Sequence, residues 1–469
     1  MRKLSALRLT AALVGAYVLS LPGARAETVR LPEQIKVDVG LAKPYMLAGQ
    51  KQTNYLRVSL TGTPMNEAVK RAPVNVAIVL DKSGSMAGDK LRKAKDAAFA
   101  AIDRLGPNDI VSVIAYDHTV EILVPATKVS DRFSIRQAIE KLTANGNTAL
   151  FAGVSKGAAE ARKFLDRQRV NRIILLSDGQ ANIGPSSPAE LGNLGASLIK
   201  EGISVTTLGL GLDYNENLMA QLALRSDGTH YFIEKSTDLA SKFGFEMQDV
   251  LSVVAQEVTI RITCADGIRP IRMLGRDADI TGQTVTTYFN QIYGEQEKYA
   301  LLEIEAPAGT DGKSRSIADV NVTYVNMATK SSEKITRAAT ARFTNTASLV
   351  DTNTNAAVMA SAVEQIALER NKLAVSLRDQ GQIEEARRVL LDNAEYLSAN
   401  AAKLKSKELA DYTLRQQQDA ANLDGPAWEQ QRKAIVEQQN IRAGQNSNAG
   451  NGGTRNQGGG FGGGGFGGR

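Results

Sequence analysis

Three oxygen-bearing side chains occupy every second position of a loop that directly follows an apolar run. VNVAIVL at 74–80 is followed by DKSGSM at 81–86, which presents Asp81, Ser83 and Ser85. Capping a helix takes one side-chain oxygen, so three in one loop indicate a site rather than an ordinary turn. From this segment alone, a phosphate-binding loop, a nucleophile and a metal site all remain open.

Two further loops carry polar side chains at comparable points of the chain. TANGNTALFAG at 143–153 places Thr148 just before a helical pattern, and ILLSDGQAN at 174–182 places Asp178 after a buried run. Ligands of open α/β sheets bind beyond the carboxyl ends of the strands. Two carboxylates and three hydroxyls at one such edge would form an oxygen-only site suited to Mg²⁺, Mn²⁺ or Ca²⁺.

The elements that must position these loops alternate between apolar runs and helical patterns. This alternation extends from about residue 73 to residue 240 and is typical of a doubly wound, mostly parallel sheet covered on both faces. The runs lie at 74–80, 110–116, 172–176, 204–210 and 230–233. We therefore expect an α/β domain over residues 71–242.

The three motifs together resemble the metal-ion-dependent adhesion site of von Willebrand factor A (VWA) domains. D-x-S-x-S after a strand, a threonine in a G-x-T loop and LLSDG after a later strand carry the resemblance, and PVNVAIVLDKSGSM is similar to bacterial members. It implies a divalent cation, Mg²⁺ or else Mn²⁺ or Ca²⁺, whose direct and water-mediated shell comes from five residues. These are Asp81, Ser83, Ser85, Thr148 and Asp178.

The resemblance also implies how such a site works. A cation held by two carboxylates and neutral hydroxyls still attracts an anion, so we expect an Asp or Glu of a partner protein to complete it, in binding rather than catalysis. The surrounding rim is expected to consist of Lys82, Asn145, Gly146, Asn147, Gln180 and Asn182. Lys82 departs from the usual uncharged residue, and either points to solvent or lowers the affinity for the cation. Asn147 stands where these domains often have glycine.

Strand-rich and helical segments flank the α/β domain. Period-2 patterns at 27–70 and 250–345 predict a β-sandwich into which the VWA domain is inserted. Residues 356–440 are expected to be helical, as a hairpin packed against the sandwich, followed by a weakly anchored polar segment. Residues 441–469 are Gly- and Asn-rich and predict a disordered tail.

The N-terminus and the composition bear on the compartment. Residues 1–26 combine a basic start, an apolar stretch and Ala24-Arg25-Ala26, which predicts a cleaved secretory signal. Its removal lowers the formal charge from +6 to +2, which leaves nucleic-acid binding without electrostatic support. A single cysteine and no later membrane-spanning segment favour an exported bacterial protein, periplasmic or secreted to the cell surface.

Enzymatic alternatives find little support in the residues. GVSKG at 153–157 matches a nucleophile elbow by letter but falls within a helical pattern. GTDGKS at 309–314 is too short for a phosphate-binding loop and predicts a hairpin turn. Two functions therefore remain: a metal-dependent protein-binding or adhesion module, or an envelope scaffold or assembly factor that binds through the sandwich and helices with a secondary metal site.

Overall fold

The computed structural model describes residues 33–65 and 71–445. The expected signal at 1–26 and most of the expected tail at 441–469 lie outside these residues. Every described helix is too short or too polar to span a membrane.

The α/β part of the chain is a six-stranded sheet with the order β6-β5-β4-β7-β8-β9. Its strands are β4 (Val74–Asp81), β5 (Ile110–Tyr116), β6 (Val120–Lys128), β7 (Val170–Ser177), β8 (Ile203–Leu210) and β9 (His230–Ile233). All neighbours pair in parallel except β6, which is antiparallel to β5. The sheet is therefore mostly parallel, as the sequence predicted, with one antiparallel strand at its edge.

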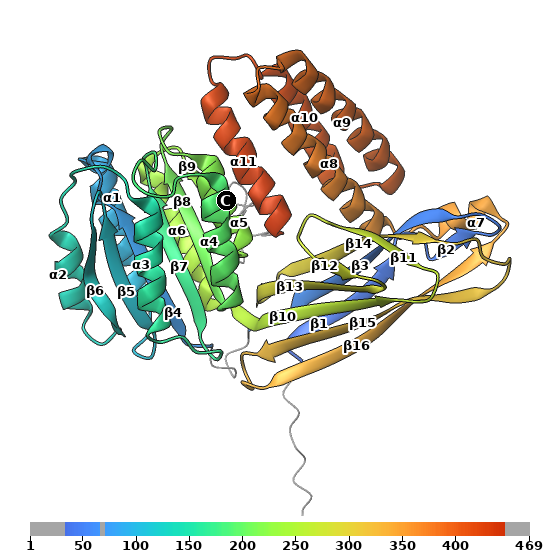
Figure 1. The fold of residues 1–469 in the computed structure, drawn as a ribbon, viewed down its shortest axis with the longest axis horizontal. Helices are drawn as coiled ribbons and strands as arrows, with labels where there is room; N and C mark the ends of the chain where they lie inside the picture. Colours follow the sequence, from blue (N-terminus) through green and yellow to red (C-terminus); the bar gives the residue numbers. More distant parts are fainter. Residues whose placement is uncertain (1–32, 66–70, 446–469) are drawn as a thin grey trace, which may run out of the picture. The chain divides into compact units, whose positions relative to one another are not determined.

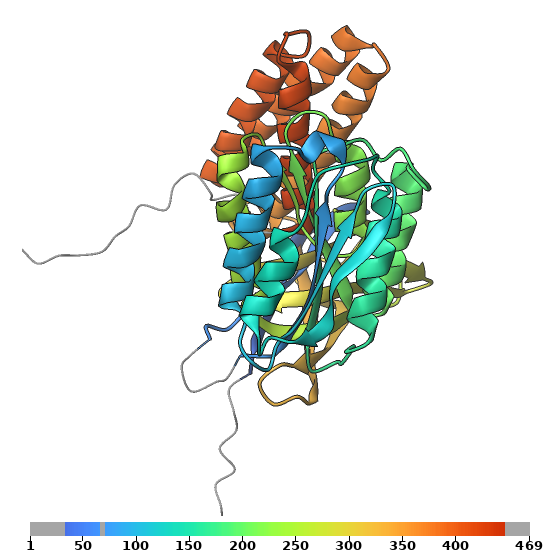
Figure 2. The same cartoon turned by 90° about the vertical axis from the view of Figure 1, so that its left-hand side faces the viewer.

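Helices cover both faces of this sheet, as Figure 2 shows. They are α1 (Asp89–Arg104), α2 (Arg132–Glu140), α3 (Leu150–Arg162), α4 (Pro188–Lys200), α5 (Glu216–Arg225) and α6 (Leu239–Leu251). Because successive strand residues point to opposite faces, Ile78 of β4 packs in one core with α1 and α6. Its neighbour Val79 packs in the other core with α3, α4 and α5. Continuous apolar runs are what a sheet buried on both faces requires.

The remaining strands form two further sheets that share one hydrophobic core, and we call them the two-sheet unit. One sheet has the order β1-β3-β14-β11 and the other β12-β13-β10-β15-β16-β2. The N-terminal members are β1 (Ile35–Leu41), β2 (Tyr45–Leu47) and β3 (Gln52–Gly62). The others are β10 (Val253–Cys264), β11 (Arg269–Leu274), β12 (Asp279–Thr281), β13 (Thr284–Tyr293), β14 (Glu297–Ala306), β15 (Ser314–Asn326) and β16 (Ser332–Thr344).

Strand β3 pairs with β14, more than 230 residues further along the chain, with Leu56 opposite Leu302. The chain leaves the two-sheet unit after β3 and re-enters it at β10, so both ends of the α/β segment join the same unit (Figure 1). GTDGKS at 309–314 falls at the turn between β14 and β15.

The C-terminal part differs from the expected hairpin. It consists of a short helix, α7 (Ala347–Thr352), and four longer ones, α8 (Ala356–Asp379), α9 (Ile383–Leu404), α10 (Lys407–Ala421) and α11 (Trp428–Gly444). Val358 and Ala362 of α8 pack on the two-sheet unit against Leu274 and Leu301. Helix α11 extends four residues into the segment predicted as tail.

Helix α11 is firmly anchored, which contradicts the prediction of a weakly held polar segment. Lys433 Nζ donates to the Tyr214 carbonyl and to Glu216, each at 2.6 Å. Asn440 bridges α5 and β9, donating to the Ala220 carbonyl at 3.2 Å and accepting from the His230 N–H at 2.9 Å. These contacts are polar, so the apolar periodicity used to recognise buried helix faces does not report them.

His230 produces a pH dependence of stability. Burial, with the Lys433 charge nearby, lowers its pKa from 6.5 to about 3, so the folded state keeps a neutral imidazole. Below pH 6.5 the unfolded chain binds the extra proton, and the free energy of unfolding therefore falls as the pH drops, by about 1.4 kcal/mol per unit. We expect the stability gap between wild type and His230→Gln in urea titrations to shrink by about 2–3 kcal/mol between about pH 6.5 and 4.5. A gap that stays constant would contradict the neutral imidazole.

Candidate functional site

The predicted site residues lie beyond the carboxyl ends of β4 and β7, which are parallel neighbours in the middle of the sheet. Asp81 is the last residue of β4, and Asp178 directly follows β7. Neither carboxylate side chain is exposed to solvent. Parallel pairing thus brings two carboxylates to one edge, and the loop after each strand decides what surrounds them.

The loop after β4 turns back over its own strand end. The Ser83 N–H donates to Asp81 Oδ1 at 2.8 Å, which bends the chain into a short 3₁₀ turn at Gly84–Met86. The hydroxyls of Ser83 and Ser85 lie 3.1 Å apart, and Ser85 Oγ donates to Asp178 Oδ1 at 2.6 Å. Four of the five predicted residues are therefore joined by direct hydrogen bonds.

Thr148 enters from a third loop, between α2 and α3. Its N–H donates to Asn182 Oδ1 at 2.9 Å, and the Asn182 N–H donates back to the Thr148 carbonyl at 3.2 Å. The Gly84 N–H bonds to the Gly146 carbonyl at 3.0 Å. Gly146 has a φ of 78°, and a Cβ there would lie 2.1 Å from Nδ1 of His118. Three loops are thus tied to one another at this edge.

The hydroxyls converge beside Gly179. A Cβ built on this glycine would lie 3.1 Å from Thr148 Oγ1, 3.3 Å from Ser85 Oγ and 3.9 Å from Ser83 Oγ. Three hydroxyl oxygens from two loops therefore surround one small volume next to Asp178. A side chain at Gly179 would extend into this volume and crowd the hydroxyls.

The charges at the site favour a cation. Asp81 accepts from Ser177 Oγ at 2.6 Å and from the Tyr116 hydroxyl at 3.4 Å. Burial raises the pKa of Asp81, and the charge of Asp178 raises it further, while the Ser177 and Ser83 hydrogen bonds lower it. Two buried carboxylates near each other repel one another, and a cation between them would relieve this repulsion.

Two lysines lie at this edge, and they make different contacts. Lys82 forms an ion pair with the buried Asp117. Its side chain therefore does not point to solvent, and Asp117 neutralises its charge. Lys90, on the first turn of α1, places Nζ 2.5 Å from Asp178 Oδ2. Sequence reasoning missed Lys90, Tyr116 and Ser177, although Lys90 lies only five residues after Ser85.

The predicted rim residues lie at the surface around the site. Asn145, Gly146, Asn147, Gln180 and Asn182 are exposed, and Lys82 is half-buried. Gln180 Nε2 donates to the Asp213 carbonyl at 2.6 Å, which brings the loop between β8 and α5 alongside. This loop adds Leu212, an exposed apolar side chain that sequence reasoning did not include.

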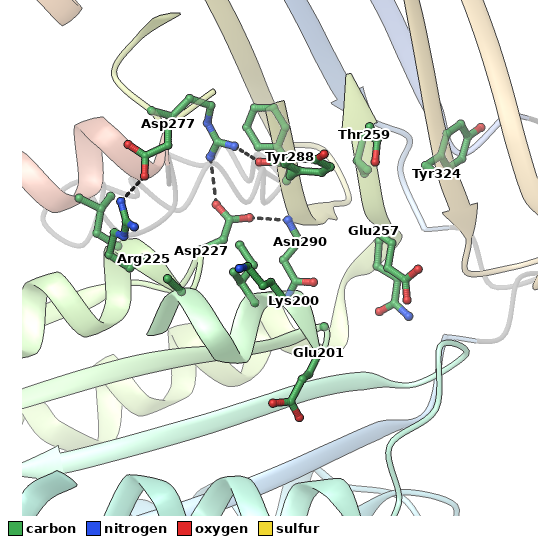
Figure 3. Close-up of a pocket in the computed structure, with 18 of the residues that line it drawn as sticks. Lys200, Glu201, Arg225, Asp227, Glu257, Thr259, Asp277, Tyr288, Asn290 and Tyr324 are labelled. Carbon is green, nitrogen blue, oxygen red and sulfur yellow. Dashed lines mark hydrogen bonds and ion pairs between the residues drawn. The ribbon is translucent and has the colours of Figure 1, made fainter. Parts of the chain in front are cut away.

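A separate cleft of about 1270 Å³ lies between α4, α5 and the strands β10 and β13 (Figure 3). Four of its charged side chains form two ion pairs. Arg225 forms an ion pair with Asp277, and Arg276 Nη2 lies 3.1 Å from Asp227 Oδ1. Asp227 Oδ2 also accepts from the Asn290 N–H at 2.8 Å. These contacts join α5 and the turn after it to the two-sheet unit.

The fold and the site's position define the class of protein module. The family model of the von Willebrand factor type A domain matches residues 75–244, and this segment is a VWA domain. VWA domains are often protein-interaction modules, and they often bind a divalent metal at the metal-ion-dependent adhesion site.

Several curated proteins are similar to this chain over roughly two fifths of its length. The uncharacterized protein sll0103 of Synechocystis is 36% identical over 174 residues, which are 37% of this chain and 41% of that protein. The human inter-alpha-trypsin inhibitor heavy chain H4 is 29% identical over 205 residues, 42% of this chain and 22% of its own length. The chain therefore spans less than half the length of these relatives.

Solved structures extend the likeness of fold beyond the VWA domain. The ArnB paralog VWA2 of Sulfolobus acidocaldarius has a TM-score of 0.63 at 18% identity, covering 88% of this chain and 98% of that one. The von Willebrand factor type A protein of Catenulispora acidiphila has a TM-score of 0.65 at 17% identity, covering 80% and 89%. Coverage this wide includes parts of the chain outside residues 75–244.

Proposed function

We propose that this protein is a non-enzymatic, divalent-metal-dependent binding or adhesion module that acts outside the cytoplasm and engages a partner protein through an Asp or Glu side chain. Asp81, Ser83, Ser85, Thr148 and Asp178 would hold the cation, Mg²⁺ or else Mn²⁺ or Ca²⁺. The observation that carries the proposal is the convergence of three hydroxyls on the volume beside Gly179, next to two buried carboxylates.

The donor set fits a hard cation. Among the described residues no group of three or more His, Cys, Asp and Glu side chains is placed to hold a metal, so the hydroxyls have to contribute. Carboxylate and hydroxyl oxygens suit Mg²⁺, Mn²⁺ and Ca²⁺, and disfavour softer metals. When bound, the cation would supply an electrophilic centre that accepts a carboxylate oxygen.

The surroundings support binding of a protein partner. Most rim residues around the site are exposed and polar, and Leu212 adds an exposed apolar side chain at the same edge. A carboxylate contact supplies direction and a part of the affinity, while most of the binding energy in protein interfaces comes from neighbouring side chains. Export is supported by the pattern of residues 1–26 and by Cys264, a single buried thiol.

Replacing Thr148 by valine tests the proposal, because it removes one hydroxyl and keeps the shape of the side chain. The hydrogen bonds between Thr148 and Asn182 use the backbone of Thr148 and survive the change. We expect Mg²⁺ affinity in calorimetry to fall about tenfold or more, with a melting temperature close to wild type. Thr127→Val is the control. Thr127 is exposed on β6 and lies opposite Val111, near the amino end of β5 and therefore at the end of the strands that is away from the site.

The same variants separate the two candidate functions. Proteins captured from an envelope extract through the cation should be lost both with EDTA and with Thr148→Val, and retained with Thr127→Val. A partner that survives EDTA and Thr148→Val binds elsewhere. That result would favour an envelope scaffold or assembly factor that binds through the two-sheet unit and the helices.

A further inference from the structure

Lys90 forms an ion pair with Asp178, one of the two carboxylates of the proposed metal site. Its Nζ lies 2.5 Å from Asp178 Oδ2, while the other oxygen of Asp178 accepts from Ser85 at 2.6 Å. The Lys90 side chain is 31% exposed, and Asp178 is not exposed at all. A buried carboxylate needs a positive partner or hydrogen-bond donors, and here both of its oxygens have one.

The other basic side chain of this edge is engaged elsewhere. Lys82 pairs with Asp117, which leaves Lys90 as the ammonium that neutralises part of the charge of Asp81 and Asp178. A divalent cation held by Asp178 would therefore meet an ammonium group already in contact with that residue. Like charges at such a separation repel each other strongly where the site is shielded from water.

Lys90 also has a route out of the site. Its side chain is long and partly exposed, and a lysine side chain easily moves its charged end into water. Nζ already lies 3.8 Å from the Cβ position of Gly211, in the loop that carries Leu212. Displacement would therefore bring the ammonium to the rim, beside the place where a partner's acidic side chain would approach.

We infer that Lys90 is a built-in competitor of the divalent cation: it pairs with Asp178 in the metal-free protein and is displaced to the rim when the cation binds. This inference rests on the proposed metal site and adds to it a residue that sets the affinity. The Lys90 ammonium and the divalent cation compete for the carboxylate of Asp178. Metal binding therefore also exposes the positive charge of Lys90 at the partner-binding edge.

Calorimetric titration of the full chain with MnCl₂ tests the competition. Lys90→Met removes the ammonium and retains much of the apolar stem, so Mn²⁺ affinity should rise about tenfold or more, while Lys90→Arg should stay near wild type. Lys93→Met, on the same helix, makes the same change in net charge and should shift the affinity less than about threefold. Unchanged or weaker binding in Lys90→Met overturns the inference, weaker binding because Lys90 would then be positioning Asp178 for the cation.

Lysine acylation followed by mass spectrometry tests the displacement itself. Saturating Mn²⁺ should speed modification of Lys90 several-fold and leave Lys93 unchanged, because the released ammonium moves into solvent. Asp81→Asn, which weakens the metal site without touching Lys90, should abolish the change. A Lys90 rate that does not respond to Mn²⁺ overturns the displacement, even if Lys90→Met binds more tightly.

The two hypotheses fail in different ways. If neither wild type nor Lys90→Met binds Mn²⁺, the metal site itself is wrong and the ion pair with Asp178 is permanent. If both bind Mn²⁺ with equal affinity, the metal site stands and the role of Lys90 is wrong. If only Lys90→Met binds measurably, the metal site and the competition by Lys90 stand, and the displacement of Lys90 in the wild type is overturned.

Discussion

Asp81→Asn is expected to abolish measurable binding of Mg²⁺ and Mn²⁺ and, in the absence of metal, to make the protein more stable than wild type. The asparagine keeps an oxygen for the Ser83 N–H, and its amide group can donate to Ser177 and Tyr116, which now contact Asp81. It removes a buried charge whose pKa is raised by burial and by Asp178. Removing a charge that burial disfavours stabilises the folded state.

Thermal melts with and without metal measure both effects together. Wild type should melt at a higher temperature as Mg²⁺ is added, because a ligand that binds the folded state stabilises it by mass action. Asp81→Asn should start higher and show no response to Mg²⁺. Ser177→Ala is a useful companion, since it removes a hydrogen bond to Asp81 while leaving the charge. An Asp81→Asn melt that still rises with Mg²⁺ would exclude Asp81 from the site.

The parts of the site that the sequence predicted are those fixed by strands and short loops. Asp81 and Asp178 follow the apolar runs of β4 and β7, and parallel strands bring their carboxyl ends to one edge. The alternation of apolar runs and helical patterns predicted a doubly wound α/β domain, and the VWA resemblance carried by the three motifs is confirmed by the family model. Metal binding by the five residues stays a prediction, although the structure brings their side chains together.

Side-chain contacts between distant parts of the chain could not be predicted from the sequence. Lys90 reaches Asp178 from a helix 88 residues away in the chain, and neither residue's local pattern specifies the other. Helix α11 was predicted to be weakly anchored because its sequence is polar. It buries Trp428 and Ile435 in an apolar cluster, and buried polar groups hold it as well, such as Lys433 at Glu216 and Asn440 at β9. Apolar periodicity detects hydrophobic packing, and it misses interfaces built from charge and amide groups.

Arg172→Leu is expected to destabilise the protein more than any surface substitution discussed above. Arg172 lies on β7 with no exposed side-chain surface, and its Nη2 donates to Gln291 at 2.5 Å and to the Tyr293 hydroxyl at 2.6 Å, both on β13. Its Nη1 lies 3.4 Å from the buried Glu246. Removing the guanidinium leaves Glu246 buried without its partner, which costs about 3–5 kcal/mol.

Urea unfolding of two matched arginine variants measures this cost. Arg167 also bridges the VWA domain and the two-sheet unit, through Glu257, but its side chain is 80% exposed. Arg167→Leu should therefore cost about 0–1 kcal/mol, and equal costs for the two variants would contradict the buried anchor. Adding Glu246→Gln to Arg172→Leu should recover part of the loss, since the unpaired charge is then gone. Arg172 lies on β7, and Asp178 directly follows the end of this strand. If the contacts of Arg172 with the two-sheet unit hold β7 in place for the site, Arg172→Leu should also weaken Mg²⁺ binding.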